Sequence, residues 1–318
     1  MSMYQKHVFA FWGAPEGGKT TLAVNMAVVL ADSGYMTCLV SASDHGELQA
    51  FFNDNIPHDK GLYAAISNGR NVREALVETR PNLCLLELDT GGDAYDIADI
   101  TPDQVKKIIA DLRDQFSYVI IDCTNYKESV FTGVGLVEAD KIVLCVPHRT
   151  TASTWHFANA QMIDALASKI FFVDADTREG GTNMNQLFAS MGLRECDISI
   201  NYVKGAYECE NFGTPIVLQS GRAERKYKDR VLALIKVLLE IENEEKKTAK
   251  ENREKREKGL FKKPDAVAER KAKLDAPGIR SKPLSAKARK RAEDEAMRRA
   301  EEAAAGLDAS DDEDDDEN

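Results

Sequence analysis

The fold is decided by one stretch of the sequence, HVFAFWGAPEGGKTT at residues 7–21. Its apolar first part, His7–Trp12, is typical of a buried strand, and a helix pattern follows the loop. Between them, Gly13–Thr20 matches the pattern G-x-x-x-x-G-K-T. Glycines let the backbone wrap so that its N–H groups point at phosphate oxygens, and the start of the helix adds its positive dipole end. The stretch therefore predicts a phosphate-binding loop, with a chance strand-turn-helix match as the alternative.

The side chains of this loop have distinct expected roles. We expect Lys19 to reach the β- and γ-phosphates, the Thr20 hydroxyl to bind Mg²⁺, and Thr21 to contact the α-phosphate. Further along, the strand Tyr118–Asp122 ends in a carboxylate at the edge of the sheet, where a second contributor to the Mg²⁺ site is needed. The predicted nucleotide-binding residues of the loop are Gly13, Ala14, Pro15, Glu16, Gly17, Gly18, Lys19, Thr20 and Thr21.

Short apolar runs alternate with helix-period stretches up to residue 241, which predicts an α/β fold with a mainly parallel sheet. The predicted strands are His7–Trp12, Met36–Ser41, Leu83–Leu88, Tyr118–Asp122, Lys141–Val146, Lys169–Val173 and Asp197–Asn201. The predicted helices are Thr20–Ser33, Thr101–Gln115, Ser153–Ala167, Thr182–Met191 and Arg222–Ile241. The last helix is too apolar for a solvated rod, so we expect it to pack on the sheet. A membrane-surface or partner-binding helix is the alternative.

Charge separates the chain into three parts. Residues 1–242, the predicted folded domain, carry 22 basic and 32 acidic groups, and an acidic surface disfavours binding of duplex DNA. Residues 243–291 are predicted to form a basic, partly helical linker, and 292–318 an acidic disordered tail, because a chain this polar cannot bury enough surface to fold. The two charged segments are opposite in sign, so they can also shield each other.

Neither a membrane span nor a secreted protein is predicted. The sequence contains no apolar run of membrane-spanning length, and its N-terminus passes directly into a strand pattern. The cysteines are scattered through strand-like runs without C-x-x-C spacing, which is typical of buried thiols in a reducing compartment. We therefore expect a cytoplasmic protein with no direct membrane insertion.

Four stretches, Gly13–Thr21, Ser41–Gly46, Tyr118–Asp122 and Ala139–Pro147, together resemble the ParA/MinD (SIMIBI-class) P-loop ATPases over residues 5–240. Within that superfamily the chain looks most like the TadZ/CpaE branch of pilus-assembly and polar-localisation ATPases. The resemblance implies a twisted, mostly parallel sheet of about seven strands flanked by helices. It also implies ATP and Mg²⁺ as cofactors, a nucleotide-dependent homodimer, and a switch that positions a cellular machine through a protein partner.

The chain departs from the family pattern at two places. The family has a signature lysine early in the loop that reaches the partner's nucleotide, and the matching position here is Ala14. The family's second strand ends in Asp-x-Asp, but this chain has Ser41-Ala42-Ser43, with Asp44 next in line as a substitute. The predicted catalytic residues are therefore Lys19, Asp44 and Asp122. Because phosphoryl transfer depends on positioning and electrostatics, we expect nucleotide binding to survive and hydrolysis to be slow.

The base-binding side is less specified. The resemblance places Asp174 where the family often has an adenine-facing Asn, and Pro215 at the other wall. An aspartate there also suits guanine recognition in related GTPases, or it caps a loop. Arg149 is either a phosphate sensor or a solvated side chain.

Three functions remain open at this stage. The first is a localisation or assembly factor of a pilus or secretion system. The second is a DNA-partition ATPase, in which residues 246–291, with 18 basic and 6 acidic groups, contact DNA non-specifically. The third, a metabolic kinase or ligase, lacks a further residue set that specifies a substrate.

Overall fold

A computed structural model describes residues 6–67, 71–92, 94–177, 181–193 and 195–239. The predicted basic linker and acidic tail lie outside the described residues, as does the end of the predicted helix 222–241. Within the described part, no helix combines the length and apolar character that crossing a membrane requires.

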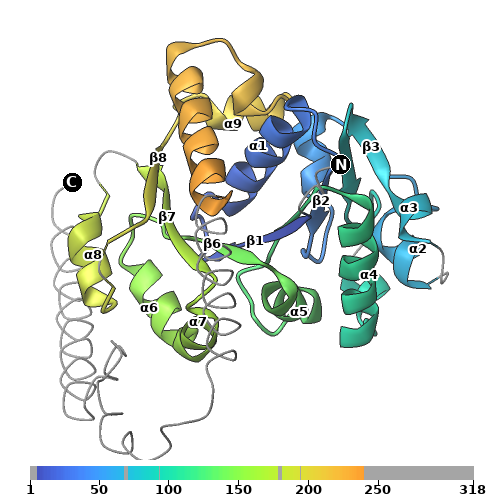
Figure 1. Ribbon diagram of the computed structural model, residues 1–318, viewed down its shortest axis with the longest axis horizontal. Coiled ribbons are helices and arrows are strands. Elements are labelled where there is room, and N and C mark those ends of the chain that lie inside the picture. Colours follow the sequence, from blue (N-terminus) through green and yellow to red (C-terminus); the bar gives the residue numbers. More distant parts are fainter. Residues whose placement is uncertain (1–5, 68–70, 93, 178–180, 194, 240–318) are drawn as a thin grey trace, which may run out of the picture. The chain divides into compact units, whose positions relative to one another are not determined.

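The core of the described chain is an eight-stranded sheet with the order β3-β4-β2-β5-β1-β6-β7-β8 (Figure 1). Every neighbouring pair is parallel except β3 with β4. The prediction of a mostly parallel α/β sheet is thus confirmed, with one strand more than expected. The strands are β1 His7–Gly13, β2 Thr37–Ser41, β3 Val77–Arg80, β4 Leu83–Leu86, β5 Tyr118–Asp122, β6 Lys141–Cys145, β7 Ile170–Thr177 and β8 Ile198–Asn201.

Helices cover both faces of the sheet (Figure 1). One face carries α1 Lys19–Asp32, η1 Leu48–Phe52, α9 Ala206–Asn211, η3 Ile216–Leu218 and a helix over residues 222–239. The other carries α2 Gly61–Ser67, α3 Val72–Ala75, α4 Pro102–Gln115, α5 Val130–Glu138, α6 Thr151–Ala158, α7 Ala160–Leu166 and α8 Met184–Ser190. A short turn, η2 Ala94–Ile97, precedes α4.

Alternation along β1 supplies both hydrophobic cores. Val8, Ala10 and Trp12 point into the core under α4 and α5, whereas Phe9 and Phe11 point into the core under α1. Successive side chains of a strand face opposite sides, so a strand covered on both faces reads as continuously apolar. The helix over 222–239 packs in the second core through buried residues such as Val231 and Leu234, as expected for its described part.

Local signals in the sequence predict some elements correctly and miss others. Thr101 and Gln104 form the capping box that starts α4, as its sequence indicates. The predicted helix Ser153–Ala167 is instead two helices, α6 and α7, which are separated at Asn159, where the backbone leaves the helical region with φ −106° and ψ 7°. The edge strand β3 escaped prediction because its sequence, VETR, is short and polar.

The carboxyl ends of the central strands meet at one edge of the sheet. Asp122 at the end of β5 lies in register with Phe11 of β1 and with Ser41 of β2. On the other side of β1, Gly13 lies in register with Cys145 of β6. The loops that follow β1, β2, β5 and β6 therefore converge, which is where open α/β sheets bind ligands.

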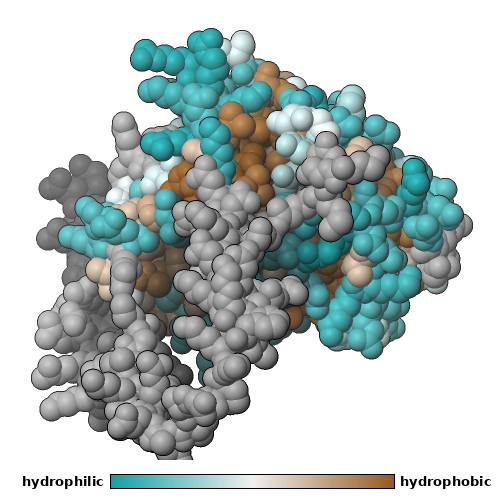
Figure 2. All heavy atoms as spheres, in the orientation of Figure 1, coloured by the Kyte–Doolittle hydropathy of each residue, from teal (hydrophilic) through white to brown (hydrophobic). Residues whose placement is uncertain are grey.

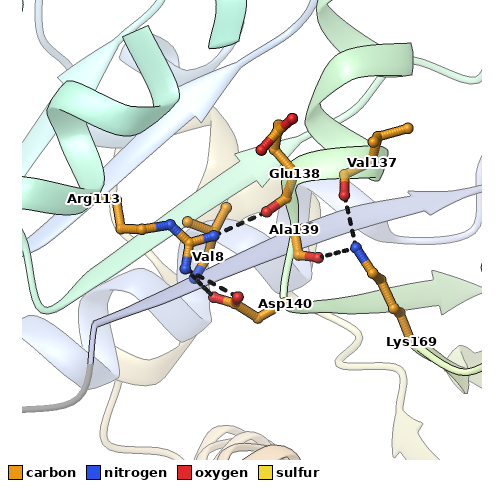
Figure 3. Close-up of polar contacts among 7 residues, drawn as sticks. All are labelled: Val8, Arg113, Val137, Glu138, Ala139, Asp140 and Lys169. Atoms are coloured by element: carbon orange, nitrogen blue, oxygen red, sulfur yellow. Dashed lines mark hydrogen bonds and ion pairs between the residues drawn. The ribbon is translucent and has the colours of Figure 1, made fainter. Parts of the chain in front are cut away.

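The amino end of the sheet is closed by a network of polar contacts (Figure 3). Asp140, just before β6, accepts two hydrogen bonds from Arg113 of α4, at 3.0 and 2.8 Å, and a third from the Val8 N–H at 2.7 Å. Arg113 also donates to the Glu138 carbonyl, and Lys169 donates to two carbonyls at the end of α5. These contacts tie α4, α5, β1 and the segment before β7 together.

Candidate functional site: the phosphate loop

The loop between β1 and α1 needs glycine at both of its ends. Gly13 has φ 144°, and a Cβ there would lie 2.1 Å from the Cys145 carbonyl oxygen. Gly18, with φ 74°, lies just before α1, where a Cβ would approach the Ala175 carbonyl oxygen to 3.3 Å. No side chain caps the start of α1. The loop therefore presents main-chain N–H groups and a helix start to a ligand.

Lys19 is the first residue of α1, and its side chain is buried. Its ammonium group donates a hydrogen bond to the Asn125 side-chain oxygen, just after β5. An ammonium group has three donors, so this bond leaves others for phosphate oxygens. Asn125 was not predicted, because nothing in its local sequence distinguishes it from any other loop asparagine.

Asp122 lies beside the loop, and one of its carboxylate oxygens makes no hydrogen bond to the described residues. The carboxyl is buried, and burial raises its pKa to about 6, while a hydrogen bond with Thr20 and the charge of Lys19 act in the opposite direction. Its Oδ1 atom has no hydrogen-bond partner among the described residues. A hydroxyl and a carboxylate are the oxygen ligands that Mg²⁺ takes, and an unpaired buried carboxylate oxygen is costly without one. Thr20 and Asp122 thus fit the predicted Mg²⁺ site.

The segment after β2 carries two carboxylates, the predicted catalytic Asp44 and Glu47. The exposed Asp44 pairs with His45 at 2.7 Å, and that hydrogen bond raises the pKa of His45. The other ring nitrogen of His45 lies 2.6 Å from Glu47. The charge of Glu47, rather than that of Asp44, acts on the pKa of Asp122. The structure therefore brings Lys19, Thr20 and Asp122 together, and the catalytic role of Asp44 stays a prediction.

Glu87 holds the segment that carries Glu47. It follows β4, is fully buried, and accepts hydrogen bonds from the Leu48 and Gln49 N–H groups at 2.8 and 2.6 Å. Burial raises its pKa to about 7 despite these bonds. The sequence carried a signal that was missed, a single carboxylate inside the apolar run Leu83–Leu88. Buried carboxylates require partners, so such a residue indicates a structural or functional role.

A cavity of about 240 Å³ opens beside the second half of the loop. It continues from the loop to Ala175 in β7 and to the chain that follows β8, so its far wall is in place to contact a base or sugar. Burial raises the pKa of Tyr227 in this wall. The lining residues are Glu16, Gly17, Gly18, Lys19, Thr20, Thr21, Ala175, Tyr202, Val203, Ala206, Tyr207, Glu210, Ile216 and Tyr227.

The other predicted binding residues lie close to this cavity without lining it. Asp174 is buried and lies 2.7 Å from the Nε2 atom of His148, and the next residue, Ala175, lines the cavity. Pro215 likewise precedes the lining residue Ile216. In the loop, Gly13 and Ala14 are buried while Pro15 is exposed, and none of the three lines the cavity. Roles for these residues in nucleotide binding stay predictions.

Comparison with known proteins agrees with this geometry. A family model described as an AAA domain matches residues 15–154. The septum site-determining protein MinD of Bacillus subtilis (strain 168) is 31% identical over 110 residues, which is 33% of this chain. The match spans 40% of that relative's own length.

Solved structures of low sequence identity share the fold. MinD of Pyrococcus horikoshii OT3, complexed with Mg-ADP, superposes with a TM-score of 0.62 at 14% identity, covering 73% of this chain and 96% of that one. A ParA family ATPase from Chlorobium tepidum TLS gives 0.62 at 17% identity, covering 71% and 99%. None of these matches distinguishes the TadZ/CpaE branch. By its loop, its sheet and these likenesses, the chain is similar to the ParA/MinD-like P-loop ATPases.

Proposed function

We propose that this chain binds Mg·ATP at the phosphate loop and acts as a nucleotide-dependent switch of the ParA/MinD type. One observation carries the proposal: Lys19, Thr20 and the unpartnered Asp122 oxygen converge beside a cavity that the loop itself lines. The Mg-ADP complex of the P. horikoshii relative supports the choice of ligand.

In this proposal, different residues of the site bind the phosphates and the Mg²⁺ ion. The main-chain N–H groups around Gly17 and Gly18 surround the phosphates, and the Lys19 ammonium binds the β- and γ-phosphates. Thr20 and Asp122 would hold Mg²⁺, which when bound neutralises charge on the phosphate oxygens. Asn125 keeps the Lys19 ammonium in the site before nucleotide arrives.

Hydrolysis is slow in this proposal, because groups that would stabilise the transferred phosphoryl group are missing. Ala14 carries no charge at the position of the family's lysine, and Ser41 and Ser43 replace the carboxylates at the end of β2. Asp44 is engaged with His45. ATP turnover by the purified protein without a partner tests this point, and a rate typical of active P-loop ATPases would contradict it.

The experiment that tests the proposal is a calorimetric titration with Mg·ATP and Mg·GTP, followed by measurement of the protein's mass in solution. We expect Mg·ATP to bind and the mass to double in its presence. Heat from neither nucleotide would overturn the proposal. Binding without a change of mass would keep the site and remove the dimer.

The cargo is proposed from the sequence resemblance to the TadZ/CpaE branch: a cytoplasmic switch that assembles or positions a pilus or secretion system through a protein partner. The acidic folded domain favours this over DNA partition. Figure 2 shows a face that is largely hydrophilic, with hydrophobic residues visible mainly where α1 and α9 lie. DNA binding measured against salt, with and without residues 243–318, separates the two, because a steep salt dependence that truncation abolishes would favour partition.

A further inference from the structure

The phosphate loop carries a negative charge at its tip. Glu16 lines the cavity, and its side chain is 63% exposed. Its backbone has φ 57°, a region that favours glycine. A carboxylate here repels an approaching triphosphate, and its backbone conformation is strained. Two unfavourable features at one residue of a phosphate site call for a compensating partner.

That partner is Arg149, on the loop after β6. Its Nη2 atom lies 2.6 Å from the Glu16 Oε2 atom, and its side chain is 52% exposed. The two loops are packed together, because a Cβ on Gly17 would lie 3.1 Å from the Cys145 carbonyl oxygen and 3.3 Å from the Pro147 ring. Arg149 therefore lies at the rim of the phosphate site, paired with Glu16 and half exposed to solvent.

A guanidinium group binds carboxylate and phosphate oxygens in the same way, with parallel N–H donors. Glu16 thus occupies Arg149 with a ligand of the same kind as a phosphate, and a phosphate carries more charge. The neighbouring Gly17, Gly18 and Lys19 are the residues that surround the β- and γ-phosphates in such loops, so the group within reach of Arg149 is the terminal one.

We propose that Arg149 binds the terminal phosphate of a nucleoside triphosphate held by this loop, and that Glu16 holds Arg149 at the loop until the nucleotide arrives. The inference rests on the proposed function and names a residue that distinguishes triphosphate from diphosphate. It also supplies a cation at the loop of a chain that has Ala14 where its family has lysine.

The test is a set of calorimetric titrations of the full chain with Mg²⁺ and either ADP or a non-hydrolysable ATP analogue. We expect Arg149→Ala to weaken binding of the analogue about tenfold and binding of ADP less than about threefold. Glu16→Gln should strengthen binding of the analogue, because it releases Arg149 and removes the repulsion. In the Glu16→Gln background, Arg149→Ala should again weaken binding of the analogue.

The controls separate this inference from its alternatives. Arg73→Ala, an exposed arginine on α3, should leave both affinities unchanged, and far-UV circular dichroism checks folding of every variant. If Arg149→Ala has no effect in the Glu16→Gln background, Arg149 only neutralises Glu16 and the inference is overturned. Equal losses for ADP and the analogue overturn it as well. Failure of the unchanged chain to bind either nucleotide overturns the proposed function, and this inference with it.

Discussion

Asp122 and Asp140 lie at opposite ends of the same sheet, and they differ in burial and in hydrogen bonding. Asp140 accepts three hydrogen bonds, two of them from Arg113 of α4 and one from Val8 of β1 (Figure 3). Asp122 is more deeply buried, yet one of its oxygens has no partner among the described residues, and its pKa is raised to about 6. Contacts within the protein satisfy the carboxylate of Asp140 at the amino end. The carboxylate of Asp122 at the carboxyl end keeps an oxygen for a ligand.

The two lysines of these ends offer the strongest test of that difference. Lys19→Ala should weaken Mg·ATP binding by at least about a hundredfold, roughly 3 kcal/mol, because no other side chain supplies a charge to the β- and γ-phosphates from within the helix start. Its effect on the free energy of unfolding should be smaller, since the fold loses one hydrogen bond to Asn125 and the attraction between Lys19 and Asp122. Titration calorimetry and urea unfolding measure the two quantities.

Lys169→Ala is the matched control at the other end. It removes two hydrogen bonds to carbonyls at the end of α5, so it should lower the free energy of unfolding by about 1 kcal/mol and leave nucleotide affinity unchanged. If Lys169→Ala weakens nucleotide binding, or if Lys19→Ala mainly destabilises the fold, the proposed difference between the two ends of the sheet is contradicted.

Glu87 allows the effect of burial on a carboxylate to be tested separately, because it is hydrogen-bonded like Asp140 but is wholly buried. Its pKa rises from 4.5 to about 7 in the folded chain. The folded state therefore holds this proton more tightly than the unfolded state, so stability falls as pH rises from about 4.5 to about 7. We expect Glu87 to contribute a loss of about 2 kcal/mol between pH 5 and pH 8.

Urea unfolding of the nucleotide-free chain across this pH range, with and without Glu87→Gln, checks the expectation. The substitution should flatten the pH dependence and add a constant offset, because the Leu48 and Gln49 N–H groups bond different carboxylate oxygens and the amide replaces one of these with an NH2 donor. Taking the difference between the variants cancels the contribution of Asp122. The exposed Glu74→Gln should retain the original slope, and an unchanged slope in Glu87→Gln would contradict the role given to burial.

Much of this arrangement could be predicted from the sequence, for physical reasons that also set the limit. The loop Gly13–Thr21 and the strand Tyr118–Asp122 are contiguous patterns with a mechanism, and the structure joins them through the register of β1 and β5. The sheet could be predicted because buried parallel strands are continuously apolar.

The rest depends on contacts between residues far apart in the chain. Glu87 meets Leu48 across 39 positions, and Lys19 meets Asn125 across 106, so neither pair leaves a local pattern. Asp44 pairs with the adjacent His45, and its predicted catalytic role stays a prediction.

The smallest expected effect is that of Asp122→Asn on the free energy of unfolding, and its direction is the most informative. At pH 8, Asp122 is ionised, and its raised pKa means that burial of this charge costs the nucleotide-free fold free energy. Asp122→Asn removes the charge, so it should raise the free energy of unfolding by about 1 kcal/mol, less than the full shift implies because the amide also lacks a partner. The gain should vanish as pH falls from about 6 toward 3.8, where Asp122 is protonated in either case.

The same substitution should weaken nucleotide binding at least about tenfold in Mg²⁺ and have little effect in EDTA, because it removes a proposed ligand of the ion. Asp140→Asn should do the reverse, lowering stability through its bonds to Arg113 and Val8 while sparing affinity. Urea unfolding at pH 8 and titrations with and without Mg²⁺ decide between the two. If Asp122→Asn destabilised the fold and left the Mg²⁺ dependence intact, Asp122 would be a structural carboxylate like Asp140, and the difference between the two ends of the sheet would have no functional meaning.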